Sequence, residues 1–194
     1  MYQNNIFLST EKPILLYLGM KNIFLLLVGS LFVAVSGYTQ EMNKVYNDPK
    51  LDKEVLIGYC DMDGLTKGDF GVYFKEEYKL YEAEAIVIKK IKSIVSNGHY
   101  EILTVFGDWC SDSQYQVPCF YKVLDDIDFP ENMTKLIAVD RSKSAQDLDI
   151  SEYDIQRVPT FIVYYKGQEI GRIIETPQKT LEKDLLDILN SKGL

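Results

Sequence analysis

The sequence has 194 residues, of which 46% are hydrophobic and 26% are charged, so one globular domain with an ordinary core and added segments is expected. Its formal net charge is −8 at pH 7, and it contains no basic cluster. Nucleic acids and anionic membrane surfaces are therefore not expected as partners, because both attract basic proteins.

The first segment, residues 1–40, is predicted to direct export. Lys21 opens a short basic start, an apolar run follows over residues 23–35, and small and polar residues come next. This order is typical of a secretory signal peptide cleaved near residues 37–41. A methionine directly before Lys21 leaves open whether residues 1–19 are translated. The alternative is an uncleaved anchor, the one case in which we expect the protein to meet a membrane.

Export implies an oxidising compartment, which we expect to be the bacterial periplasm or cell envelope. Cys60, Cys110 and Cys119 all follow the signal segment. Because three is an odd number, at least one thiol must stay free or pair with another molecule.

Residues 41–81 are predicted to form an N-terminal extension. The polar stretch over residues 41–53 predicts a loose leader, and the apolar run over residues 54–60 predicts a strand or a docked segment. Asp61 and Asp63 are spaced like calcium ligands, but the positions after them fail the EF-hand pattern. We interpret both aspartates as helix-capping residues of a turn.

Two helices are predicted before the central strand. Aromatic residues at spacings of three and four over residues 70–81 predict a helix whose rings belong to the core, with ligand stacking as the alternative. Apolar residues at helical spacing over residues 83–95 predict a second helix, ended by Asn97 and Gly98. The extension is expected to pack on this second helix.

A strand followed at once by a helix forms the centre of the sequence. Residues 100–106 are rich in β-branched and aromatic residues and predict a buried strand, whereas residues 114–128 have helical apolar spacing. Cys110 lies between them, at a helix N-terminus, where unpaired N–H groups and the helix dipole favour a thiolate. Asp108 and Asp112 place negative charge nearby, which favours the neutral thiol, and the sequence leaves the balance open.

The remaining elements alternate between strand and helix. Residues 135–140 predict a buried strand parallel to the central one, because a helix lies between the two. Residues 150–156 predict a short helix or turn, and residues 160–165 and 168–175 predict a hairpin. Pro177 is expected to open a last helix.

Two motifs in this order resemble the thioredoxin family. Trp109-Cys110-Ser111-Asp112-Ser113, with Pro118 eight residues after the cysteine, resembles that family's active-site turn and kinked helix. Val158-Pro159-Thr160, followed by an apolar strand, resembles its cis-proline loop. The resemblance covers residues 98–192. It implies that residues 82–194 adopt a thioredoxin-like α/β fold, with a central mixed sheet flanked by helices.

The sequence departs from this family at its redox centre. Cys110 retains the nucleophile, but Ser113 stands where the family has a second, resolving cysteine. The resemblance therefore implies a monothiol: Cys110 attacks a disulfide, the Ser113 hydroxyl donates a hydrogen bond to the sulfur, and another thiol must release the product. The family's buried carboxylate would fall near Thr104, which accepts no proton at neutral pH.

The same resemblance implies a surface that contacts protein thiols or disulfides, or an extended peptide. Trp109 shields the sulfur, and the backbone of Val158, before Pro159, pairs with the peptide. Arg157 is either a recognition residue or ordinary surface charge. The alternative function is a redox-inactive module that binds a peptide or partner protein. A thiol peroxidase is less favoured, because the segment lacks the threonine and arginine surroundings of that family.

The sequence predicts no further site at the remaining candidate residues. Cys119 lies nine residues after Cys110, which along a helix is too far for a disulfide, so we predict a structural thiol. Pairing of Cys60 with either cysteine stays an alternative. His99, the single histidine, is predicted to be a loop or strand-start residue. Because the sequence has neither zinc-ligand spacing nor a phosphate loop, no metal and no cofactor are expected.

Overall fold

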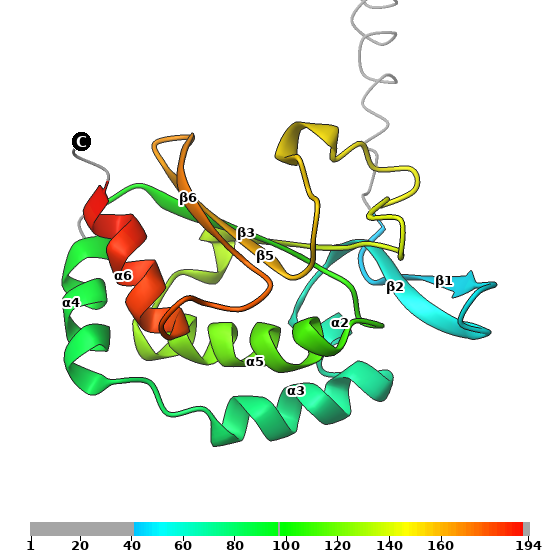
Figure 1. Cartoon of the computed structure of the whole chain (residues 1–194), viewed down its shortest axis with the longest axis horizontal. Coiled ribbons are helices and arrows are strands. Elements are labelled where there is room, and N and C mark those ends of the chain that lie inside the picture. The colour runs from blue at the N-terminus through cyan, green and yellow to red at the C-terminus, as the bar shows by residue number, and fades with distance from the viewer. Residues whose placement is uncertain (1–40, 97, 192–194) are drawn as a thin grey trace, which may run out of the picture. The chain divides into compact units, whose positions relative to one another are not determined.

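Residues 41–96 and 98–191 are described by the computed structural model of the chain (Figure 1). They belong to one unit that spans residues Gln40–Leu194. The predicted signal segment, residues 1–40, lies outside the described residues. Within the described part, no helix combines the length and the apolar character needed to cross a membrane.

A mixed sheet of six strands organises the fold, with the strand order β1-β2-β4-β3-β5-β6. The strands are β1 (Lys44–Asp48), β2 (Lys53–Cys60), β3 (Tyr100–Phe106), β4 (Thr134–Ala138), β5 (Thr160–Tyr165) and β6 (Gln168–Ile174). Strands β3 and β4 are parallel, as predicted, and every other neighbouring pair is antiparallel. A parallel pair needs a crossover connection, which a helix supplies here.

The long helices α3, α4, α5 and α6 cover one face of this sheet (Figure 1). The helices are α2 (Met62–Leu65), α3 (Gly68–Leu80), α4 (Ala85–Val95), α5 (Ser111–Asp126) and α6 (Leu181–Ser191), with the 3-10 turns η1 (Glu131–Met133) and η2 (Ser151–Tyr153). Helices α3, α4, α5 and α6 lie below the sheet in this view, and the segment that carries η2 lies above it. The prediction of a mixed sheet flanked by helices is confirmed.

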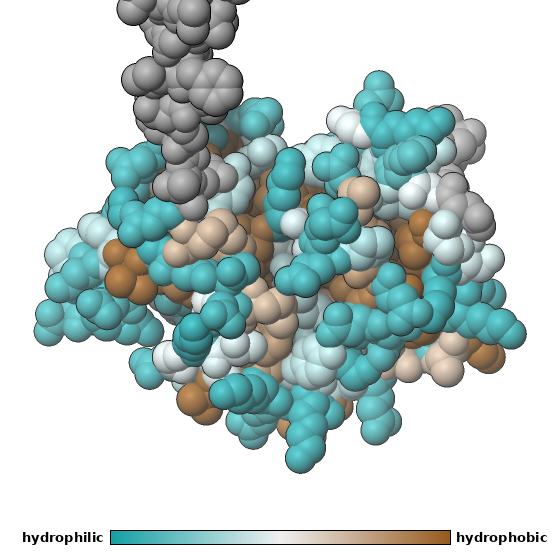
Figure 2. Space-filling view, turned by 180° about the vertical axis from the view of Figure 1, so that it is seen from behind, coloured by the Kyte–Doolittle hydropathy of each residue, from teal (hydrophilic) through white to brown (hydrophobic). Residues whose placement is uncertain are grey.

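The sheet separates two apolar clusters. The larger cluster lies between the sheet and the long helices, where Phe120 of α5 and Phe161 of β5 pack with ring centroids 4.2 Å apart. The smaller cluster lies on the other face, around Val105 and Ile162, and Trp109 and Cys110 pack against it. Figure 2 shows the molecule from behind, with hydrophilic side chains over most of the visible face and hydrophobic ones between them. The candidate nucleophile therefore borders the smaller cluster.

The N-terminal extension contributes two strands to the sheet, so the predicted loose leader is wrong. Strand β1 pairs with β2 along its whole length, from Lys44 opposite Ile57 to Asp48 opposite Lys53. Asp48 is buried, and its carboxylate accepts hydrogen bonds from backbone N–H groups in the connecting turn. Strand β1 is an edge strand in which the apolar Val45 is exposed and the polar Asp48 is buried, so its sequence gives no alternating apolar pattern.

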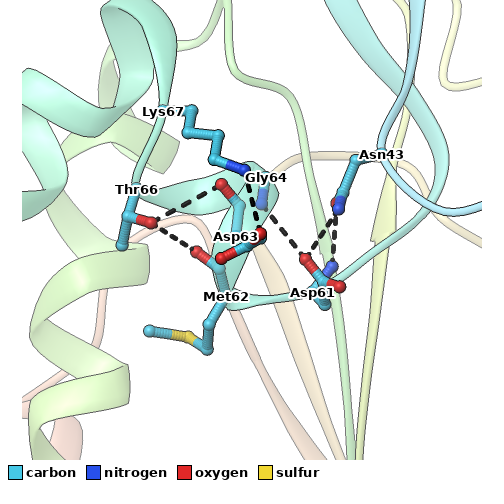
Figure 3. A network of polar contacts seen from close by, with 7 residues as sticks. All are labelled: Asn43, Asp61, Met62, Asp63, Gly64, Thr66 and Lys67. Carbon is cyan, nitrogen blue, oxygen red and sulfur yellow. Dashed lines mark hydrogen bonds and ion pairs between the residues drawn. The ribbon is translucent and has the colours of Figure 1, made fainter.

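The end of β2 is fixed to α2 by a network of polar contacts (Figure 3). The Asp61 side chain accepts a hydrogen bond of 3.1 Å from the backbone N–H of Gly64, which confirms its prediction as a capping residue. Asn43 Nδ2 donates to Asp61 Oδ1 at 2.7 Å, and Asn43 Oδ1 accepts from the Asp61 N–H at 3.0 Å. A Cβ atom at Gly64 would lie 2.2 Å from Asn43 Oδ1, so this approach needs a glycine.

Helix α3 packs mainly against α5, rather than on α4 as the sequence predicted. Phe70 and Phe74 are buried, which confirms a core role for this part of the aromatic stripe. The Tyr78 hydroxyl donates to Asp125 at 2.5 Å, and the Tyr81 hydroxyl donates to Glu182 at 2.6 Å. The stripe therefore ties α3 both to α5 and to α6.

Candidate functional site

Cys110 occupies the junction between β3 and α5, as the sequence predicted. It is the N-cap residue of α5, with φ −95° and ψ 126°, and its side chain is only partly buried. Its backbone N–H donates to the Gly107 carbonyl at 3.0 Å, and its own carbonyl accepts from the Gln114 N–H at 2.9 Å. These two bonds form the turn that begins the helix, so the thiol lies beside the helix N-terminus.

The loop before β5 lies against this thiol. The peptide bond between Val158 and Pro159 is cis. The Cys110 Sγ–H donates a hydrogen bond of 3.4 Å to the Val158 carbonyl. The Pro159 carbonyl accepts from the Glu175 N–H at 2.7 Å, which fixes the loop to the end of β6. Three residues predicted from two distant motifs, Cys110, Val158 and Pro159, thus meet in one place.

Trp109 covers the turn, and a hydrogen bond from its indole ring fixes its position. Its Nε1–H donates to the Val139 carbonyl at 2.8 Å. A Cβ atom at Gly107 would lie 2.5 Å from the indole ring, so only a glycine lets the ring lie this close to the backbone. The indole therefore lies over the turn before Cys110, in a position set by the residue after β4 and by the turn itself. That it shields the sulfur stays a prediction.

The Ser113 side chain makes a different contact from the predicted one. Ser113 is fully buried, and its hydroxyl oxygen accepts a hydrogen bond of 3.2 Å from the Gly107 N–H. The sequence predicted a hydrogen bond to the Cys110 sulfur instead. Ser113 lies one helical turn after Cys110, where it reaches back to the turn and holds the Gly107 backbone.

Asp108 connects the site to the N-terminal hairpin, a role that the sequence did not predict. Its Oδ2 accepts a hydrogen bond of 2.9 Å from the Leu56 N–H, and its carbonyl accepts from Gln114 Nε2 at 2.8 Å. Burial raises the pKa of Asp108, while the Leu56 N–H and the charge of Lys53 act in the opposite direction. The carboxylate is therefore turned toward β2.

The other two cysteines are buried and free. Burial raises the pKa of Cys60 to about 12 and that of Cys119 to about 12. Both side chains lie in the larger apolar cluster, while Cys110 borders the smaller one. The alternative pairing of Cys60 does not occur in this structure, because all three thiols are free. Cys119 is more deeply buried than the sequence suggested, at 1% exposure.

Three further candidate residues make contacts that support the fold. Thr104 is buried, and it hydrogen-bonds the Tyr121 hydroxyl. Arg157 is exposed and forms an ion pair of 2.7 Å with Glu175. His99 is an exposed loop residue directly before β3, as predicted, and its carbonyl accepts a hydrogen bond from the Lys166 N–H.

The sequence analysis missed Arg141, which follows β4. Its guanidinium lies 5.5 Å from the centroid of the Trp109 ring. The carboxyl ends of parallel strands meet at one edge of a sheet, so residues after β3 and residues after β4 are expected to be neighbours. This topological signal places Arg141 beside Trp109, although no local motif marks it.

Comparisons with known proteins find relatives of low sequence identity. No protein-family model matches the sequence. The chain is 26% identical over 105 residues to mitochondrial thioredoxin-2 of Schizosaccharomyces pombe, which covers 49% of this chain and 74% of that protein. It is 25% identical over 140 residues to the chloroplastic thioredoxin-like protein HCF164 of Arabidopsis thaliana, which covers 72% of this chain and 49% of that protein. The chain thus aligns with about half the length of the second relative.

Solved structures give a similar result for the fold. A protein of unknown function from Pseudomonas aeruginosa matches with a TM-score of 0.51 at 15% identity, over 70% of this chain and 92% of that chain. Mitochondrial thioredoxin 3 of Saccharomyces cerevisiae matches with a TM-score of 0.35 at 19% identity, over 57% of this chain and 98% of that chain. The sequence is thus similar to thioredoxin-like proteins. The mixed sheet flanked by helices is the thioredoxin-like fold that the two sequence motifs imply.

Proposed function

We propose that this protein is an exported thioredoxin-like protein that reacts with protein disulfides through the single thiol of Cys110. The observation that carries the proposal is the position of this thiol at the N-terminus of α5, 3.4 Å from the Val158 carbonyl. A helix N-terminus favours a thiolate, and partial exposure lets a substrate sulfur approach it.

The proposed reaction is one exchange step. The Cys110 thiolate attacks one sulfur of a substrate disulfide, a new S–S bond forms to that sulfur, and the old S–S bond breaks. The departing substrate sulfur leaves as a thiolate and takes a proton from water. The product is a mixed disulfide between Cys110 and the substrate.

Release of this product requires a second thiol. Ser113 cannot form a disulfide, and its hydroxyl is bonded to the Gly107 backbone. Cys60 and Cys119 are buried, so neither reaches the mixed disulfide without unfolding. We therefore infer that the mixed disulfide persists until an external thiol reduces it.

The substrate surface of the proposal consists of Trp109, Val158 and Pro159. The cis loop contacts the sulfur through the hydrogen bond from Cys110 to the Val158 carbonyl, and the Trp109 indole is fixed over the same turn by its bond to the Val139 carbonyl. An extended peptide that carries the disulfide lies along this surface. Backbone pairing with the loop orients the peptide sulfur toward Cys110.

A reaction with a neutral aromatic disulfide, dithiodipyridine, tests the proposal. The folded wild-type protein should release one equivalent of thiopyridone quickly, and peptide mapping should place the adduct on Cys110. The Cys110→Ser variant should release none, and the Cys119→Ser variant should react like the wild type. If Cys110 stays unmodified in the folded protein, the proposed redox function is refuted. Retained peptide binding would then favour the alternative, a redox-inactive binding module.

Export is the second part of the proposal and rests on the sequence of residues 1–40. Expression of the full chain in a bacterium with a periplasm, followed by N-terminal sequencing of the product, tests it. A mature protein that begins near residues 37–41 is expected. A cytoplasmic product that retains the apolar run would contradict export.

A further inference from the structure

Arg141 differs from the other two arginines in forming no ion pair with an acidic residue of the described part of the chain. The sequence contains three arginines, and two of them form ion pairs, Arg157 with Glu175 at 2.7 Å and Arg172 with Glu169 at 2.6 Å. Among the ion pairs of the described residues, none includes Arg141. Its side chain is exposed and instead lies over Trp109, 5.5 Å from the ring centroid.

Asp140 and Asp108 each accept hydrogen bonds from other groups through one carboxylate oxygen. Asp140, its neighbour in the chain, accepts hydrogen bonds from the backbone N–H groups of Ser142 at 2.8 Å and Ser144 at 3.0 Å, and from the Ser142 hydroxyl at 2.6 Å. Asp108 accepts from the Leu56 N–H, on the side of β2. The guanidinium of Arg141 is exposed over Trp109, the residue before the candidate nucleophile, and no hydrogen bond among the described residues uses its donors.

Two other charged groups belong to the same surroundings. Asp112 lies in the first turn of α5, and Glu175 lies near the cis loop but is paired with Arg157. The chain as a whole carries a net charge of −8. A guanidinium held over an aromatic ring still presents its planar edge to a carboxylate.

We propose that Arg141 makes the site select substrates with an acidic side chain close to the reactive disulfide. This inference rests on the proposed exchange at Cys110 and adds the substrate class. The substrate carboxylate pairs with the Arg141 guanidinium while the peptide lies across Trp109. Arg141 then acts on substrate approach and orientation, and the exchange step itself is unchanged.

Matched peptide disulfides test this selectivity. Each short blocked peptide carries one cysteine as a pyridyl disulfide, with glutamate, glutamine or lysine as the next residue. Attack by the Cys110 thiolate forms the peptide–Cys110 disulfide and releases thiopyridone, whose absorbance gives the rate. Because the leaving group is the same in all three peptides, rate differences report the flanking charge. Rates measured first with free cysteine correct for differences in the peptides' own reactivity.

The wild-type protein should react about fivefold faster with the glutamate peptide than with the glutamine peptide, and slower still with the lysine peptide, as expected for unit charges about 4 Å apart in water. The Arg141→Gln variant should lose this order, and Arg141→Glu should reverse it. Lys143→Gln, which removes a neighbouring positive charge from the same loop, is the control and should keep it. The order should also vanish near 1 M salt, where the Debye length is about 3 Å.

The possible outcomes separate this inference from the proposed function. If all three peptides react at equal rates with the wild-type protein, Arg141 selectivity is refuted and the exchange at Cys110 stands. If no peptide reacts, the exchange is refuted. Binding of the same peptides with serine in place of cysteine, measured by Trp109 fluorescence on the Cys110→Ser variant, then decides the selectivity. Tighter binding of the glutamate peptide supports the role of Arg141, and equal binding refutes it.

Discussion

Gly107→Ala is the substitution that tests most directly how the site is built. A Cβ atom at this position would lie 2.5, 2.7 and 2.8 Å from three atoms of the Trp109 ring, whereas ordinary contacts begin near 3.4 Å. The ring must therefore move by about 1 Å, because the backbone is fixed by the Cys110 and Ser113 hydrogen bonds. This movement removes the bond from the indole N–H to the Val139 carbonyl, now 2.8 Å long.

The expected cost combines two effects. Overpacking costs about 1–3 kcal/mol, and the lost hydrogen bond adds about 0.5–1.5 kcal/mol, so the free energy of unfolding should fall by about 1.5–4.5 kcal/mol. Urea unfolding followed by circular dichroism measures this change. Trp109 is the single tryptophan of the chain, so its emission reports the site directly and should shift to longer wavelength as the ring becomes more exposed.

A double-mutant cycle isolates the cause. In a Trp109→Ala background the clash is absent, so Gly107→Ala should cost much less than in the wild type, and the two effects should be strongly non-additive. Ser111→Ala, at an exposed position of the same turn, serves as a control for a general effect on the turn. A Gly107→Ala protein with wild-type stability and wild-type emission would refute the placement of Trp109 over the turn.

Two further predictions concern the helical layer and the buried thiols. Tyr81→Phe removes the hydroxyl that donates to the buried Glu182 carboxylate at 2.6 Å. The free energy of unfolding, measured by urea titration, should therefore fall by about 1.5–3 kcal/mol. The control Tyr73→Phe, at an exposed position, should change it little. Burial is the largest single effect and opposes ionisation of Glu182, but hydrogen bonds from Tyr81, from Thr180 and from backbone N–H groups together lower its pKa. The Tyr81 contribution should be present above the unfolded value of 4.5 and be lost as the pH falls through the folded value, and equal acid sensitivity of wild type and Tyr81→Phe would count against it. Cys60 and Cys119 should resist alkylation at neutral pH until denaturant unfolds the chain, because both are buried and burial raises the pKa of each to about 12. If mass spectrometry finds either cysteine modified in the native protein, its burial is disproved.

The strongest sequence patterns predicted the centre of the fold. Residues 100–106 were predicted as a buried strand, and β3 has these bounds. The parallel strand after the helix followed from the same logic, because a helix between two strands requires a crossover. Strand β3 and the helix after it together place Cys110 at a helix N-terminus. The nucleophile position was therefore predictable from local periodicity.

The N-terminal strand was not predictable in this way. Edge strand β1 has one neighbour and a solvent-facing side, so its residues carry no alternating apolar signal. At the end of β6, Ile173 is buried and Ile174 is 46% exposed, a difference between two adjacent isoleucines that composition does not predict. An irregularity in the pairing of β5 and β6 between Val163 and Tyr164 shifts the register there.

Contacts within the site depend on side-chain directions that spacing does not give. Ser113 follows Cys110 at the interval at which helix residues are neighbours, so a bond to the sulfur was a reasonable prediction. The side chain points instead to the Gly107 N–H, which the turn leaves unpaired. Asp108 and Arg141 have partners from β2 and from the Trp109 ring, and only the assembled sheet brings these together.

The central claim is that one accessible thiol acts without a resolving partner, and the Ser113→Cys variant tests it most directly. The wild-type and variant proteins are mixed with a disulfide-bonded peptide, quenched in acid and analysed by mass spectrometry. The wild-type protein should accumulate a peptide adduct on Cys110 that only an added thiol removes. The Ser113→Cys variant should lose the adduct by itself and end with a disulfide between positions 110 and 113. A wild-type protein that forms no adduct, or that releases it without added thiol, would contradict the account.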